Sequence, residues 1–169
     1  MQQAIAYSET GHLCLATLHA NNASQTLDRI INFFPESARG QLLIDMSLNL
    51  KAVVSLRLLR GTDGKRIPAV ELMLATPYVS DLIEKGEIHK LRDAMQQGHE
   101  QGMQSFDDAL YQLYVDGRID HAQALDAADS RNDLALRFRL EGLAPTNDPN
   151  ALQLDEFSGD PPALPPSRG

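Results

Sequence analysis

The chain has 169 residues and a formal net charge of −8, from 23 acidic and 15 basic side chains. This length suits one domain with a core of its own. The acidic balance argues against nucleic acid and against an anionic membrane surface as partners. The single cysteine, Cys14, excludes a disulfide framework within the chain and fits a reducing compartment. We recognise no secretory signal and no apolar run of membrane-spanning length, so we expect no membrane span.

Residues 9–23 are the stretch around which we expect the rest of the chain to be organised. Residues 1–10 have the pattern of the last turns of a helix, which Gly11 can end in a left-handed conformation. Residues 13–18 are apolar on both alternating faces, which is typical of a strand buried on both sides in a parallel sheet. Because ligands bind beyond the carboxyl ends of such strands, we expect His19 at the ligand edge of the sheet. His12 precedes the run and would lie at the opposite end of the strand.

Helical periodicity and a turn signal predict the next part of the chain. Asn22 can cap a helix, and the Asp-Gly pair at residues 63–64 is a strong hairpin signal. The expected elements are a helix over residues 23–33, a longer helix over 38–54, and two strands of a β-hairpin over 55–60 and 67–74.

The second half has the pattern of short capped helices followed by a change of composition. Thr76 precedes a proline at the start of one helix, and Ser105 with Asp108 resembles a capping box. Helices are expected over residues 77–85, 88–97, 105–115, 120–128 and 130–142. From Leu143 the sequence is rich in proline, aspartate and glycine, so we expect a disordered tail whose short apolar spots could dock on a partner.

Residues 9–23, with the sequence ETGHLCLATLHANNA, resemble the histidine-box segment of the secretion-type ATPases. The similarity is specifically to type IV pilus retraction ATPases of the PilT/PilU kind. The paired histidines in E-T-G-H-L-x-x-x-T-L-H-x-N-x-A are a much more specific signal than a lone histidine. The similarity continues to about Gly142, and residues 129–134 resemble the end of PilU more than that of PilT.

The resemblance implies an α/β fold, namely the C-terminal portion of a RecA-like ATPase domain with a partial sheet and a β-hairpin. A cluster of short helices and a disordered tail would follow. The implied regions are a partial RecA-like ATPase core over residues 1–75, a helical region over 76–142, and an acidic, proline-rich tail over 143–169. In the family a nucleotide-binding half precedes the matching region, so we expect the chain to be a fragment.

A hexameric ATPase of this class needs a loop that cradles the phosphates and an acid that positions Mg²⁺. The sequence contains no G-x-x-x-x-G-K-[ST], and residues 61–66 have the wrong spacing and the pattern of a hairpin turn. The Walker B strand is missing as well. We therefore expect ATP and Mg²⁺ to be cofactors of the intact family protein, and expect this chain alone neither to bind them nor to hydrolyse ATP. We predict no other metal site, because a strand separates the two histidines and no third ligand is obvious.

By resemblance, the catalytic set is His19, His12 and Glu9, and the cofactor-binding set is His19, Thr17 and Arg29. His19 would contact the γ-phosphate and report its loss, with Thr17 supporting it; alternatively it only ends a strand. His12 would transmit nucleotide state between domains or subunits, held by Glu9, or it is a buried histidine bonded to backbone. Arg29 is either a phosphate or interface arginine or part of a solvated helix face.

Residues 78–85 align with a short helix that retraction ATPases need for retraction. Two arginines of its PilT core are replaced here by Ser80 and Glu84. This departure indicates an accessory motor; the alternative is an ordinary capped amphipathic helix.

The resemblance implies the C-terminal portion of an ATP-hydrolysing motor for type IV pilus retraction and twitching motility, dependent on PilT. Its implied partners are its own copies in a hexamer or a PilT-like ATPase in a mixed assembly, and an inner-membrane pilus platform protein. Its implied location is the cytoplasm, peripheral at the inner face of the cytoplasmic membrane. The alternative is a non-catalytic interaction module, in which the helical half and acidic tail bind and modulate pilus motor subunits.

Overall fold

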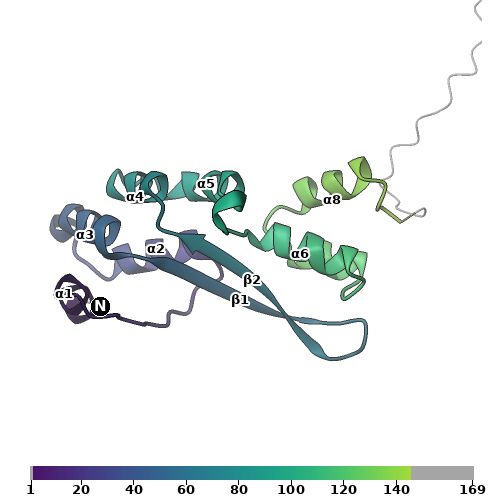
Figure 1. Cartoon of the computed structure of the whole chain (residues 1–169), viewed down its shortest axis with the longest axis horizontal. Helices are drawn as coiled ribbons and strands as arrows, with labels where there is room; N and C mark the ends of the chain where they lie inside the picture. The colour runs from purple at the N-terminus through teal and green to yellow at the C-terminus, as the bar shows by residue number, and fades with distance from the viewer. Residues whose placement is uncertain (1, 146–169) are drawn as a thin grey trace, which may run out of the picture.

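The computed structural model describes residues 2–145, which form helices around one long β-hairpin (Figure 1). The α-helices are α1 (Gln2–Glu9), α2 (Ala23–Asn32), α3 (Glu36–Asn49), α4 (Pro77–Glu84), α5 (Leu91–Gln97), α6 (Phe106–Val115), α7 (His121–Ala127) and α8 (Arg131–Leu140). The strands are β1 (Ala52–Arg60) and β2 (Arg66–Leu74), and the 3-10 turns are η1 (Ile88–Lys90) and η2 (His99–Gln101).

The β-hairpin predicted from the Asp-Gly pair is confirmed. β1 and β2 pair antiparallel from Ala52 opposite Leu74 to Arg60 opposite Arg66. Gly64 has a φ of +78°, a conformation that L side chains rarely adopt, so the turn requires glycine here. The N–H of Thr62 donates to the carbonyl of Arg118 at 2.9 Å, which ties the hairpin tip to the turn after α6.

Two apolar clusters form at opposite ends of the hairpin (Figure 1). The first cluster contains buried side chains of α2, α3, α4 and α5 together with Val53 and Met73, which face each other across the hairpin. The second cluster contains buried side chains of α6, α7 and α8 together with Ile67 and Ala69 of β2. The hairpin is therefore shared between two separately packed groups of helices.

The predicted helix starts are confirmed in four cases, one of which is Asp120, whose carboxylate caps α7 by accepting the N–H of Gln123 at 2.7 Å. Asn22 caps α2 by accepting the N–H of Gln25 at 2.9 Å, and Thr76 caps α4. Ser105 forms the predicted capping box at the start of α6. Ser130 precedes α8 as expected, but within residues 2–145 its side chain makes no cap hydrogen bond. Its backbone N–H instead donates to a carboxylate of α6.

The prediction of a buried strand over residues 13–18 is wrong. These residues have irregular structure. Residues 13–17 are exposed, with Leu13 82% and Leu15 90% accessible, and Leu18 is only partly buried. A strand is stabilised by hydrogen bonds to a neighbour, and within residues 2–145 no strand pairs with this run. The apolar side chains of residues 13–17 therefore stay exposed in this structure.

Two other boundaries differ from the predictions. The helix expected over residues 38–54 ends at Asn49, because Leu50 turns extended at a ψ of 135°. Val53 and Val54 belong to β1, where β-branched side chains are favoured. Leu143, the first residue of the expected tail, packs against the second cluster, and its carbonyl accepts the hydroxyl of Tyr114 at 2.7 Å. The rest of that tail, from residue 146, lies outside the described residues. In the described part of the chain, no helix is long and apolar enough to cross a bilayer.

We expect Phe138→Ala to lower the free energy of unfolding by about 3–5 kcal/mol, because it leaves a ring-sized cavity in the second cluster. The Phe138 ring is fully buried and packs edge-on against Tyr114, with 4.6 Å between ring centroids. Urea unfolding of the purified chain measures the loss. Leu136→Ala on the same helix is the control, since half of that side chain is exposed. Equal losses for the two variants would contradict this account of the second cluster.

Candidate functional site

His12 lies just after α1 and is exposed. Its ring atom Nδ1 is 2.9 Å from the hydroxyl oxygen of Thr10, and its ring contacts Tyr7 edge-on at a centroid distance of 6.1 Å. The expected alternative of a buried histidine is therefore wrong for this structure. Glu9 is exposed at the end of α1, and the hydrogen-bond partner of the His12 ring is Thr10 rather than Glu9.

His19, Thr17 and Arg29 are all exposed. Leu18, between the first two, is partly buried against the first cluster and anchors this segment. Thr17 lines an open cleft of about 660 Å³, whose other walls come from α1 and from residues 33–35. Arg29 lies on α2, which turns Leu27 and its apolar neighbours inward. The structure thus presents these side chains to solvent.

A buried glutamate of β2 holds the segment that follows His19. Glu71 is 2% exposed, and its Oε1 accepts the N–H of Ala23, at the start of α2, at 2.6 Å. Ser55, which lies opposite Glu71 in the hairpin, also donates to it. Burial raises the pKa of Glu71 above its ordinary value, although the Ala23 N–H opposes the increase.

Glu71 is not among the residues predicted from the sequence, although the pattern of β2 contains a signal for it. Ile67, Ala69 and Met73 alternate along β2 and face the buried side, and Glu71 occupies the same face. A carboxylate at an inward position of a strand needs a hydrogen-bond donor in the folded protein. That donor is the free N–H at the first turn of α2, which sequence alone could not place nearby.

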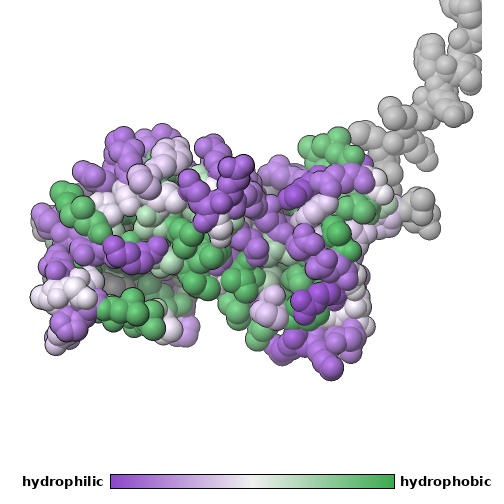
Figure 2. Space-filling view, viewed as in Figure 1, coloured by the Kyte–Doolittle hydropathy of each residue, from purple (hydrophilic) through white to green (hydrophobic). Residues whose placement is uncertain are grey.

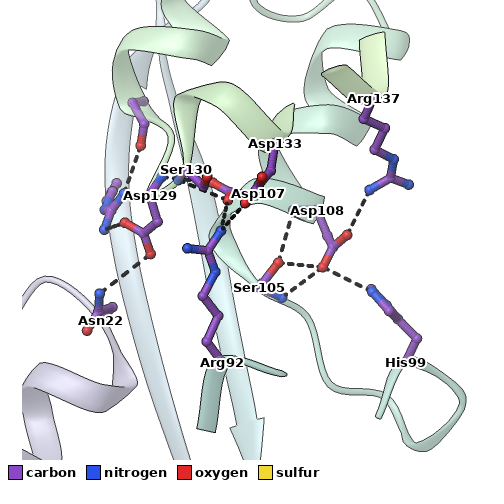
Figure 3. Close-up of polar contacts among 12 residues, drawn as sticks. Asn22, Arg92, His99, Ser105, Asp107, Asp108, Asp129, Ser130, Asp133 and Arg137 are labelled. Atoms are coloured by element: carbon purple, nitrogen blue, oxygen red, sulfur yellow. Dashed lines mark hydrogen bonds and ion pairs between the residues drawn. The ribbon is translucent and has the colours of Figure 1, made fainter. Parts of the chain in front are cut away.

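A second carboxylate holds part of the helical half together (Figure 3). Asp108 of α6 bonds to the Ser105 hydroxyl, contacts His99 Nε2 at 3.0 Å, and accepts from Arg137 at 2.9 Å. Burial opposes ionisation of Asp108, but the Ser105 hydroxyl and the Arg137 guanidinium hold its pKa below its usual range. These contacts join η2, α6 and α8, and their role is to position helices.

The residues present do not form a nucleotide cradle by themselves. Thr17 and His19 lie on an open, exposed segment, and the sequence has no glycine-rich loop to surround phosphates with backbone N–H groups. They can supply at most one wall of a phosphate site, so no chemical step through ATP follows from this chain alone. Within residues 2–145, no three His, Cys, Asp or Glu side chains are placed to hold a metal ion.

Comparison with known proteins decides the family. Residues 1–105 match the family model described as "Type II/IV secretion system protein". The chain belongs to this family. Its relatives include the type IV pilus ATPase PilU of Pseudomonas aeruginosa, 56% identical over 141 residues, which are 83% of this chain and 37% of PilU. The pilus retraction ATPase PilT of the same organism is 34% identical over 125 residues, 74% of this chain and 36% of PilT.

Solved structures of this kind of ATPase have a similar fold. A crystal structure of the pilus retraction motor PilT with bound ADP has a TM-score of 0.70 and 32% identity, covering 78% of this chain and 37% of that one. The ATPase DotB of Yersinia pseudotuberculosis has a TM-score of 0.65 and 27% identity, with coverages of 75% and 33%. The predicted combination of short helices with a β-hairpin, similar in fold to PilT, is confirmed, as is the closer similarity to PilU than to PilT. The chain spans little more than a third of the length of these curated relatives.

We expect Glu71→Gln to become more stable relative to the unchanged chain as the pH rises from 4 to 7. The folded-state pKa of Glu71 is raised above 4.5, so the unfolded chain ionises first as the pH increases. Ionisation of the Glu71 carboxyl therefore lowers the free energy of unfolding as the pH rises above 4.5. Glutamine does not ionise, so the variant does not lose this stability. Urea unfolding at several pH values measures the difference between the two proteins.

Glu71→Ala is the companion variant, and it should cost about 1–3 kcal/mol because the buried Ala23 N–H loses its acceptor. A stability difference between Glu71→Gln and the unchanged chain that stays constant from pH 4 to 7 would refute the assignment.

Proposed function

We propose that this chain is the C-terminal part of a PilU-like subunit of a type IV pilus retraction motor that acts together with a PilT-type ATPase. The supporting observation is its 56% identity to PilU over 141 residues. The complete subunit would hydrolyse ATP within a homo-hexamer or a mixed assembly with the PilT-type ATPase. It would act in the cytoplasm, against the pilus platform protein at the inner face of the cytoplasmic membrane.

In this proposal, the exposed segment that contains Thr17 and His19 completes a nucleotide pocket whose other walls come from the rest of the subunit. ATP bound with Mg²⁺ supplies the phosphoryl group and the driving free energy. In the complete subunit, the His19 imidazole would donate a hydrogen bond to the γ-phosphate, and Thr17 and Arg29 would supply further donors. His12 and Glu9 transmit the state of the nucleotide to a neighbouring domain or subunit. Exposure of all five residues is compatible with such shared contacts.

The proposed regions are the partial ATPase core over residues 1–75, the helical region over 76–142 and the tail over 143–169. The helix α4 lies at the start of the second region and supports the accessory role. It buries Val79, Leu82 and Ile83 in the first cluster. By resemblance, its Ser80 and Glu84 stand at positions where the PilT core has arginines. Retraction would therefore depend on PilT for the contacts that those arginines make.

A chimera tests the motor proposal. In P. aeruginosa PilU, the region that matches this chain is replaced by the 169-residue chain, and the chimera is expressed in a strain that lacks PilU. We expect the chimera to hydrolyse ATP and restore twitching, while the 169-residue chain alone shows no Mg²⁺-dependent turnover. His19→Ala in the chimera should reduce ATP turnover about 100-fold or more, the range for a lost group that stabilises developing charge.

His89→Ala is the matched control, because His89 is an exposed histidine in η1 to which we assign no role. Normal turnover by the His19→Ala chimera would refute the sensing role. Robust ATP hydrolysis by the 169-residue chain alone would refute the claim that it lacks essential parts.

A row of exposed apolar side chains favours a second candidate, a module that binds a motor ATPase subunit without catalysis. Val54, Leu56 and Leu58 alternate along one face of β1, and more than half of each side chain is exposed. Apolar surface is visible near the middle of the molecule, where the hairpin runs (Figures 1 and 2). Contiguous apolar surface of this kind is typical of protein contacts.

For this candidate, we expect the immobilised chain to capture purified full-length PilT. Leu56→Ser should weaken the capture about tenfold, because it buries an unpaired hydroxyl group in the contact. Leu140→Ser is the control, because that exposed leucine lies on α8, away from β1. Absence of capture by the unchanged chain would remove this candidate function.

A further inference from the structure

One arginine of β1 contacts both the segment after His19 and the helical half. Arg57 donates to the carbonyl of Asn21 at 3.2 Å and to the carbonyl of Ala127, at the end of α7, at 2.8 Å. It also forms an ion pair with Asp129 at 2.5 Å, and its guanidinium lies 3.9 Å from the centre of the Phe106 ring. A planar guanidinium can satisfy several such acceptors at once, which lysine cannot do.

Asp129 extends the contact to the helix that follows His19 (Figure 3). Its second carboxylate oxygen lies 3.5 Å from the side-chain nitrogen of Asn22. Asn22 is the residue that caps α2, and it is three positions beyond His19. The loop between α7 and α8 thus reaches the start of α2 both directly and through Arg57.

The loop that contains Asp129 is itself fixed by the helical half. The carboxylate of Asp107, on α6, accepts the backbone N–H groups of Asp129 at 2.8 Å and Ser130 at 3.1 Å. Arg92 of α5 donates to the same carboxylate at 2.7 Å. These hydrogen bonds to two successive backbone N–H groups fix the conformation of the loop between α7 and α8. They thereby fix the position from which the Asp129 side chain extends.

We propose that Arg57 and Asp129 are positioning residues that couple the geometry of the His19 segment to the loop between α7 and α8. Exposed ion pairs on a protein surface usually contribute little. This pair differs because each side chain is only 23% exposed and because Arg57 also satisfies carbonyls at Asn21 and Ala127. Any displacement of the α7–α8 loop therefore changes the hydrogen bonds of the residues next to His19. The consequence for nucleotide sensing rests on the proposed function, but the physical coupling does not.

Amide hydrogen exchange of the 169-residue chain tests the coupling. Asp129→Ala should speed exchange of the amides in residues 20–25 about threefold to tenfold, the range expected for the loss of one net hydrogen bond. Asp126→Ala is the matched control, because Asp126 is in the last turn of α7 and pairs with Arg131 on the surface. Equal exchange of residues 20–25 in the two variants would overturn the proposal.

If Asp129→Ala speeds amide exchange throughout the chain, a second pair of more conservative variants tests the proposal. Arg57→Lys keeps the charge but loses the planar fork, so exchange should become faster both in residues 20–25 and in residues 127–130. Arg60→Lys, on the exposed end of the same strand, should change neither segment. A change confined to one of the two segments, or to neither, would overturn the proposal.

The PilU chimera separates this coupling from the proposed function. If both are correct, Asp129→Ala in the chimera should lower kcat for ATP with KM changed less than twofold, because the substituted side chain does not touch nucleotide. A chimera with normal kcat, together with altered exchange in residues 20–25, would leave the coupling intact and refute its role in sensing. Unaltered exchange would refute the coupling itself, whatever the chimera does.

Discussion

The pairing of β1 with β2 is the constraint on which the rest of the structure depends. Both apolar clusters take residues from this hairpin, with Val53 and Met73 in the first and Ile67 and Ala69 in the second. Side chains alternate between the two faces of a strand, so a register slip of one residue would turn an inward set outward. The tight turn at Gly64 fixes the register, and one local feature thereby aligns the two groups of helices that pack on the hairpin.

On its inward face, the middle of the hairpin is polar, whereas the two ends of that face are apolar. Ser55, Arg57 and Glu71 lie there, between the residues given to the two clusters. These side chains bind backbone groups that helices leave unpaired at their ends: the N–H of Ala23 at the start of α2 and the carbonyl of Ala127 at the end of α7. Polar inward positions on a strand thus serve to dock helix ends in defined places.

Local features of the sequence predicted local features of the structure. The caps at Asn22, Thr76 and Ser105 depend on residues three positions apart, and the hairpin turn depends on adjacent residues. The buried strand over residues 13–18 was predicted from its apolar pattern alone, but a strand also needs neighbours, and these come from elsewhere in a chain. The family resemblance was recognised from the two spaced histidines of the motif. That recognition does not depend on whether their side chains are buried.

In the candidate site, too, short motifs could be recognised in the sequence, but contacts between residues far apart in the chain could not. Exposure of His12 and His19 and the bond between Thr10 and His12 are visible only in the structure. Glu71 is 48 positions from its partner Ala23, and Arg57 is 72 positions from Asp129, so no short motif reveals either contact. The roles assigned to His19, Thr17, Arg29, His12 and Glu9 stay predictions.

The only cysteine of the chain, Cys14, lies between the two motif histidines and is exposed. A thiol-reactive fluorophore or spin label would therefore attach at one place, without any engineered substitution, and within a few residues of both imidazoles. A label on Cys14 would thus report spectroscopically whether this segment becomes ordered when another subunit binds.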